Sequence, residues 1–251
     1  MTARFNSHGL NDDETDYSRK EGLSRVLLLG DSVAEATQVQ RSDNFGERLE
    51  RKLRENGEPV EIVNAGHSGF GTDNELLYFE YEGHRYQPDV VLLALNLQND
   101  IAENSPTIVQ RMYRGGAAHP KAGVAIDAAG SLQIDPTPYE KALIAWESDS
   151  WRSRPVLAWL RRNSFFVRHL SNLLRADTRP RAPSWPATYP AELEVYAAPP
   201  TGDWLEARRL TAAMLFRLRE IVEQHGSKLL VVVSVKWWKS PMVINRSVAI
   251  G

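Results

Sequence analysis

Cysteine is absent from this chain of 251 residues. Its absence excludes disulfide bonds, thiolate metal sites and cysteine nucleophiles, and it leaves the redox compartment open. Long apolar runs are also lacking, because no stretch approaches the roughly 18 apolar residues of a membrane-spanning helix. The first residues have no apolar segment of the signal-peptide kind. As written, the sequence predicts a cytoplasmic protein with no membrane span, unless an upstream anchor is missing from it.

An excess of charge of one sign is lacking as well. The chain has 30 Lys and Arg against 32 Asp and Glu, a net charge of −2, so nothing global favours a nucleic-acid partner. No Asp, Glu and His residues share the spacing of a metal site, so no metal is predicted. The glycines at 66, 69 and 71 reverse the dinucleotide-binding order and follow the second predicted strand, so no cofactor is predicted either.

Short apolar segments alternate with amphipathic ones. Strands are predicted at residues 25–29, 60–64, 89–95 and 229–235, and helices at 43–56, from 72 onward, at 155–174 and at 203–224. Ser42 or Asp43 is expected to cap the first helix, and Thr72 with Glu75 to form a capping box. This order predicts a three-layer α/β/α fold with a parallel, doubly wound, flavodoxin-like sheet.

The regular βα pattern breaks between residues 101 and 202, which hold 11 of the 14 prolines. We interpret this stretch as an irregular, cap-like insertion with a small hairpin at 123–134. The expected organisation is an N-terminal arm, 1–24, and one α/β domain, 25–251, that includes the insertion. The basic stretch 151–181 is expected to be a solvated helix face, with an anionic substrate or lipid headgroup as the alternative partner.

Three polar loops follow three of the predicted strands. The first reads Gly30-Asp31-Ser32, the second runs from Asn64 to Gly69, and the third is Leu97-Gln98-Asn99-Asp100. Because parallel strands end at one edge of the sheet, these loops are expected to meet where ligands bind in open α/β folds. Ser32 is therefore a candidate nucleophile.

The set of loops resembles the SGNH (GDSL) hydrolase superfamily over residues 25–105. The resemblance implies an SGNH-type sheet with Ser32 as the nucleophile. It also implies an oxyanion hole made by the Ser32 N–H, the Gly69 N–H and the Asn99 side chain. Leu97 departs from the family pattern, because it stands where the third loop normally has a glycine. Asp31 and Asp100 are expected to play a supporting part in substrate binding, bracing the loops by accepting backbone N–H bonds.

The general base is missing from this pattern. In the family an Asp-x-x-His block near the C terminus supplies the acid and base, and none of the six histidines here has Asp three residues before it. We therefore predict a chain truncated, or shifted in frame, before that block, without its last βα unit. His67, the one histidine in the three loops, is a hypothetical substitute base. Trp237 and Trp238 would then be exposed and would favour self-association.

These features predict a carboxylic ester hydrolase of the esterase or lipase type. It would act through an acyl-enzyme on a small-molecule or carbohydrate acyl ester, with activity impaired by the missing acid–base pair. Two alternatives stay open. One is a non-catalytic remnant that binds a ligand or partner through the same pocket. The other is an SGNH-type O-acyltransferase or deacetylase acting on carbohydrate, which would use the same residues.

Overall fold

The structure, a computed structural model, describes residues 5–105, 107–109, 121–137, 195–196 and 202–234. Several predictions lie outside these residues: the helix at 155–174, the basic stretch 151–181, the tryptophan pair at 237 and 238, and most of the insertion.

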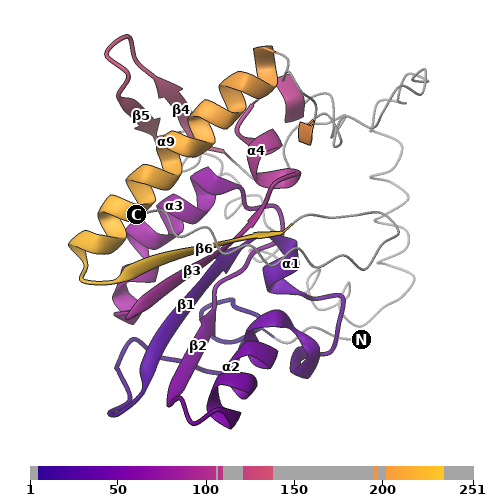
Figure 1. The fold of residues 1–251 in the computed structure, drawn as a ribbon, viewed down its shortest axis with the longest axis vertical. Helices are drawn as coiled ribbons and strands as arrows, with labels where there is room; N and C mark the ends of the chain where they lie inside the picture. The colour runs from indigo at the N-terminus through magenta and orange to yellow at the C-terminus, as the bar shows by residue number, and fades with distance from the viewer. Residues whose placement is uncertain (1–4, 106, 110–120, 138–194, 197–201, 235–251) are drawn as a thin grey trace, which may run out of the picture.

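A parallel sheet of four strands in the order β2-β1-β3-β6 forms the centre of the described residues (Figure 1). The strands are β1 (Ser24–Gly30), β2 (Val60–Asn64), β3 (Val90–Asn96) and β6 (Lys228–Ser234). The two inner strands, β1 and β3, are nearly continuous runs of branched aliphatic residues, the composition of strands covered on both faces. The order matches the first four strands of a flavodoxin-like sheet, so the predicted strands and their parallel arrangement are confirmed.

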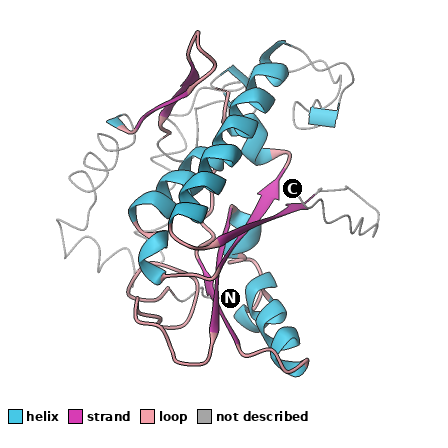
Figure 2. Cartoon of the chain, turned by 60° about the vertical axis from the view of Figure 1, so that its left-hand side comes forward, coloured by secondary structure: helices cyan, strands magenta, loops and turns pink. Residues whose placement is uncertain are grey.

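Helices cover both faces of this sheet, which gives three layers (Figure 2). The helices are α1 (Ser32–Glu35), α2 (Phe45–Glu55), α3 (Thr72–Tyr81), α4 (Asn99–Glu103) and α9 (Gly202–Gln224), with 3₁₀ turns η1 (Arg41–Asp43) and η2 (Gly83–Tyr86). Because side chains alternate along a strand, Leu27 and Leu29 pack against α3 and α9, while Leu28 faces α2. The predicted α/β/α fold is confirmed.

A two-stranded hairpin leaves the three-layer core beside α9. It consists of β4 (Gly123–Ile126) and β5 (Leu132–Asp135), paired antiparallel, as the sequence predicts. The Asp127 side chain accepts the backbone N–H groups of Ala129 and Ser131 at 2.9 Å and closes the turn. One face of the hairpin packs against the core cluster beneath α9.

Two helix starts differ from the sequence prediction. The cap of α2 is Asn44, whose side chain accepts the Glu47 N–H at 2.7 Å, because Ser42 and Asp43 are taken up in η1. The cap of α3 is Gly71, and the Asn74 side chain, not that of Glu75, accepts its N–H at 3.4 Å. Both predictions were wrong because a cap depends on the path of the chain before the helix.

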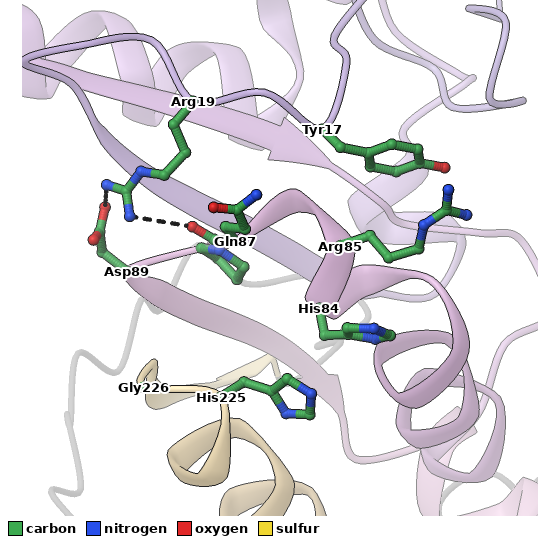
Figure 3. Close-up of a pocket in the computed structure, with 9 residues that line it drawn as sticks. Tyr17, Arg19, His84, Arg85, Gln87, Asp89, His225 and Gly226 are labelled. Atoms are coloured by element: carbon green, nitrogen blue, oxygen red, sulfur yellow. Dashed lines mark hydrogen bonds and ion pairs between the residues drawn. The ribbon is translucent and has the colours of Figure 1, made fainter.

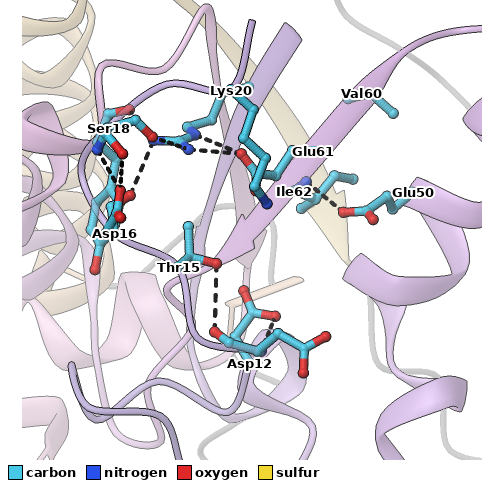
Figure 4. Close-up of polar contacts among 12 residues, drawn as sticks. Asp12, Thr15, Asp16, Ser18, Lys20, Glu50, Val60, Glu61 and Ile62 are labelled. Atoms are coloured by element: carbon cyan, nitrogen blue, oxygen red, sulfur yellow. Dashed lines mark hydrogen bonds and ion pairs between the residues drawn. The ribbon is translucent and has the colours of Figure 1, made fainter. Parts of the chain in front are cut away.

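The described part of the N-terminal arm, residues 5–23, contains no helix or strand and wraps around the buried side chain of Arg25. Arg25 Nη2 donates to Glu61 at 2.7 Å and to the Ser18 carbonyl at 2.8 Å. Lys20 pairs with the same glutamate (Figure 4). The Asp12 side chain accepts the N–H of Asn64, the last residue of β2, at 2.8 Å. The arm is thereby fixed against β1 and β2.

No helix in the described part of the chain is both long enough and apolar enough to cross a bilayer.

Candidate active site

The first predicted loop turns sharply at the carboxyl end of β1. A Cβ on Gly30 would lie 2.8 Å from the Ala34 Cβ and 3.2 Å from the Ala94 carbonyl oxygen, so this turn needs glycine. Asp31 caps α1, its Oδ1 accepting the Val33 N–H at 2.8 Å. Ser32 is the first residue of α1 and is half-buried. The strand, the glycine and the cap together hold the serine at the sheet edge.

The second loop packs directly on the first. The Asn64 amide donates to the Ala34 carbonyl at 2.9 Å, and the His67 N–H donates to the Gly30 carbonyl at 2.9 Å. At Gly66 an added Cβ would lie 2.5 Å from the Glu35 backbone nitrogen, so only glycine allows this approach. The loop that carries Gly69 is thus fitted to the helix that carries the serine.

Glu35 braces the second loop from α1. Its Oε2 accepts the Ser68 N–H at 3.1 Å and a further bond from the Ser68 hydroxyl. Gly69 follows with a φ of +84°, a left-handed conformation that favours glycine. Sequence reasoning missed Glu35, because a glutamate three residues after a candidate serine carries no signal of its partner in a distant loop.

The third loop is joined to the first through Asp31. The Asp31 Oδ2 accepts the side-chain amides of Asn96 at 2.9 Å and Asn99 at 3.0 Å. Asp100 in turn accepts the Asn96 backbone N–H at 2.6 Å. Both aspartates are buried, so they lie behind the site rather than on its surface. Asn96, which the sequence analysis did not single out, ends β3 and belongs to this network.

His67 lies in the second loop, as the sequence requires, and its imidazole ring packs on Phe70 with centroids 4.7 Å apart. Its backbone reaches Gly30, two residues before Ser32. The role of His67 as a base stays a prediction.

A cluster of buried carboxyl groups lies beneath the three loops; we call it the acid cluster, and it comprises Asp31, Asp73, Glu75, Asp100 and Glu103. Among the described residues neither Glu75 oxygen has a hydrogen-bond partner. Burial, with the charge of Asp31, raises the pKa of Glu75 to about 8. Burial and Glu75 likewise raise the pKa of Asp100 well above its usual range. Among the described residues, Lys121 pairs with two members of the cluster, Asp73 and Glu103.

We expect Glu75→Gln to stabilise the protein at high pH. Between pH 4.5, its ordinary pKa, and about 8, folded Glu75 holds a proton that the unfolded chain has lost. Stability therefore falls as pH rises through this window, by up to about 1.4 kcal/mol per pH unit. Glutamine cannot titrate, so the free energy of unfolding of the variant should match that of the wild type at pH 5 and exceed it at pH 9. Urea unfolding at pH 5 and pH 9 measures this difference, with the exposed Glu58→Gln as control. The same difference in free energy of unfolding between variant and wild type at both pH values would contradict the prediction.

In the described residues, no three or more His, Asp and Glu side chains are grouped so that they could hold a metal ion.

A separate pocket of about 640 Å³ lies at the opposite end of the sheet (Figure 3). Asp89, just before β3, and Gly226, just before β6, line it, so it sits at the amino ends of the strands. Arg19 pairs there with Asp89 at 2.7 Å, and the rings of His84 and His225 lie 4.8 Å apart. The pocket is therefore distinct from the edge that carries Ser32.

Comparison with known proteins gives matches among solved structures alone. No family model matches the chain. No curated protein matches it either. It is similar to TesA, with 22% identity and a TM-score of 0.28 over 38% of this chain and 57% of that one. The chain thus spans little more than half the length of TesA.

Two other solved structures match over more of both chains. The psychrotrophic esterase EstA from Pseudoalteromonas sp. is 14% identical, with a TM-score of 0.33 over 83% of this chain and 77% of that one. AlinE4, an SGNH-hydrolase family esterase, is 20% identical, with a TM-score of 0.32 over 84% of this chain and 77% of that one.

Proposed function

We propose that this chain is a serine hydrolase of acyl esters that acts through an acyl-enzyme at Ser32. The observation that carries the proposal is the double hydrogen bond at Asp31. Its carboxylate, adjacent to Ser32 in the chain, accepts the Asn99 amide at 3.0 Å and the Asn96 amide at 2.9 Å. A candidate nucleophile and a candidate oxyanion donor from two separate strands are thereby held at one edge of the sheet.

The proposed reaction begins with attack of the Ser32 Oγ on the ester carbonyl carbon while its proton passes to a base. The tetrahedral intermediate collapses, the C–O bond to the alcohol breaks, and the alcohol leaves with a proton. Water then gives a proton to the base as it attacks the acyl-enzyme carbonyl, the bond from that carbon to the Ser32 Oγ breaks, and the serine regains its proton as the carboxylic acid leaves. Both attacks place negative charge on the carbonyl oxygen, so donors aimed at that oxygen supply the main stabilisation.

Three donors are proposed for this oxyanion: the N–H groups of Ser32 and Gly69 and the side-chain amide of Asn99. The Asn99 amide has two N–H groups. Asp31 accepts from this amide, which leaves its second N–H for a substrate and fixes the plane of the group. A donor that is oriented before substrate arrives costs no reorganisation when charge develops.

The base is the open part of this proposal. His67 is our hypothesis for it, and a chain without a positioned base would have kcat lowered by about 10⁴- to 10⁶-fold. If Ser32 reacts equally fast in a His67→Ala variant, that hypothesis is wrong. Transfer of the acyl group to a sugar hydroxyl instead of water would use the same residues, and product analysis with and without a carbohydrate acceptor separates the two reactions.

A serine-directed fluorophosphonate tests the proposal independently of the substrate. We expect one adduct on the folded chain, mapped by mass spectrometry to the peptide that contains Ser32. The adduct should disappear in Ser32→Ala and persist in the control Ser42→Ala. Absence of an adduct, in a chain shown to be folded by circular dichroism, would contradict the enzyme proposal and favour a non-catalytic protein that binds ligands at this edge.

A further inference from the structure

Lys121 connects the described part of the insertion to the candidate site. It lies two residues before β4, and its side chain is only 17% exposed. Its Nζ lies 2.7 Å from Glu103 Oε2, 2.8 Å from Asn74 Oδ1 and 3.2 Å from Asp73 Oδ1. The next residue adds a backbone contact, because the Ala122 N–H donates to Asp73 at 3.2 Å. Lys121 therefore joins the segment before β4 to the first turn of α3 and to α4.

The residues that Lys121 contacts lie within about one helical turn, in sequence, of the candidate oxyanion donors. Asp73 and Asn74 form the first turn of α3, which begins right after the loop that carries Gly69. Glu103 lies four residues after Asn99 in α4, so the two share one face of the helix. The lysine thus contacts α4, which carries Asn99, and the first turn of α3, which follows the loop that carries Gly69.

The contact is built to hold a charged ammonium group. A Cβ on Gly71 would lie 2.8 Å from the Lys121 Nζ, so glycine there makes room for the lysine head. Burial lowers the pKa of Lys121, but the carboxylates of Asp73 and Glu103 outweigh it and raise that pKa overall. The ammonium group also offsets the like charges of Asp73 in α3 and Glu103 in α4, which would otherwise repel each other.

We propose that Lys121 is a positioning residue that holds the start of α3, and through it the preceding Gly69 loop, against α4, so that the Gly69 N–H and the Asn99 amide converge on one oxygen. The proposal rests on the proposed function. Its physical reason is that two donors on separate elements are useful only if the elements keep a fixed spacing, and a displacement near 1 Å can cost about 100-fold in rate.

The test is the kinetics of Ser32 phosphonylation in Lys121→Met, which keeps the length of the side chain and removes its charge. We expect the maximal rate to fall by about 10- to 100-fold with little change in the half-saturating concentration, because the donors act in the transition state. The matched control is Lys20→Met, which removes another lysine paired with a buried glutamate, Glu61, away from the site. A wild-type rate in Lys121→Met would overturn the proposal.

A double-mutant cycle separates positioning from general stability. If Lys121 positions both donors, then Lys121→Met should lower the rate less in an Asn99→Ala chain than in the wild type, because only the Gly69 N–H is left to be displaced. Fully additive losses would overturn the proposal. If Lys121→Met does not fold, Glu103→Gln, which leaves the lysine its contact with Asp73, takes its place in the cycle.

Failure of the proposed function can be distinguished from failure of the Lys121 proposal. If the folded wild type is not labelled at Ser32, the enzyme proposal is wrong, and NMR then tests the role of Lys121. Positioning predicts that Lys121→Met shifts the Gly69 backbone amide and the Asn99 side-chain amide and speeds Gly69 hydrogen exchange, while Lys20→Met leaves both unchanged. Unshifted signals would overturn the positioning role.

Discussion

Replacement of Asn99 by alanine is expected to lower the rate of Ser32 acylation by about 10²- to 10³-fold, the effect of losing one oxyanion donor, worth roughly 3–4 kcal/mol. The folded structure should change little, because Asn99 is half-buried and Asp31 keeps the Asn96 amide and the Val33 N–H as partners. The measurement is the second-order rate constant for a chromogenic acetate ester and for fluorophosphonate labelling.

The controls for Asn99→Ala separate donor loss from loop damage. Asn56→Ala, at the exposed end of α2, should leave the rate unchanged. Asn96→Ala removes the other amide on Asp31 and should give a smaller loss, because that group braces the carboxylate without facing substrate. An Asn99→Ala chain that is folded and reacts at the wild-type rate would show that Asn99 is not an oxyanion donor.

Replacement of Gly66 by alanine is expected to be the most damaging single-methyl change to the site. The new Cβ would lie 2.5 Å from the Glu35 nitrogen and 2.7 Å from the Ala34 carbonyl carbon. These are backbone atoms and cannot rotate away, so the second loop or α1 must move. We expect a loss at or above the upper end of the roughly 1–3 kcal/mol that overpacking costs. Slower labelling of Ser32 should accompany it.

Urea unfolding measures the effect of Gly66→Ala. Gly202→Ala is its matched control, because nothing lies within 4 Å of a Cβ at that position in α9. Alanine there should be neutral or slightly stabilising, since it is the better helix former. Equal unfolding midpoints for the two variants would show that the second loop does not approach α1 as closely as the structure places it.

Local pattern was sufficient to predict the layers and the sheet edge at which the three loops meet. The four strands are apolar runs bounded by turn residues, and each pairs in parallel with its neighbours in the sheet, as predicted. Right-handed crossovers between parallel strands then bring their carboxyl ends to one edge. For this reason the amino-acid pattern alone is enough to expect that the loops of Ser32, Gly69 and Asn99 meet.

The contacts of individual side chains could not be predicted in this way. Glu75 has the sequence position of a capping residue but is fully buried, because α4 and the Lys121 segment contact the start of α3. Glu35 and Lys121 are charged residues whose neighbours in the sequence do not indicate their partners. The contact of Glu35 with Ser68 spans 33 residues, and the contact of Lys121 with Asp73 spans 48. Hydrophobic periodicity does not indicate contacts between side chains so far apart in the sequence.

The sequence by itself therefore determined the fold class, the parallel sheet and the edge at which Ser32 is presented, because these follow from periodicity, glycine and the handedness of the chain. The tertiary structure alone decided that Asp31 accepts the Asn99 amide, that Glu35 holds the second loop and that Lys121 faces a buried acid cluster. Those contacts depend on which distant side chains converge at distances near 3 Å, and that is fixed only when the layers pack together.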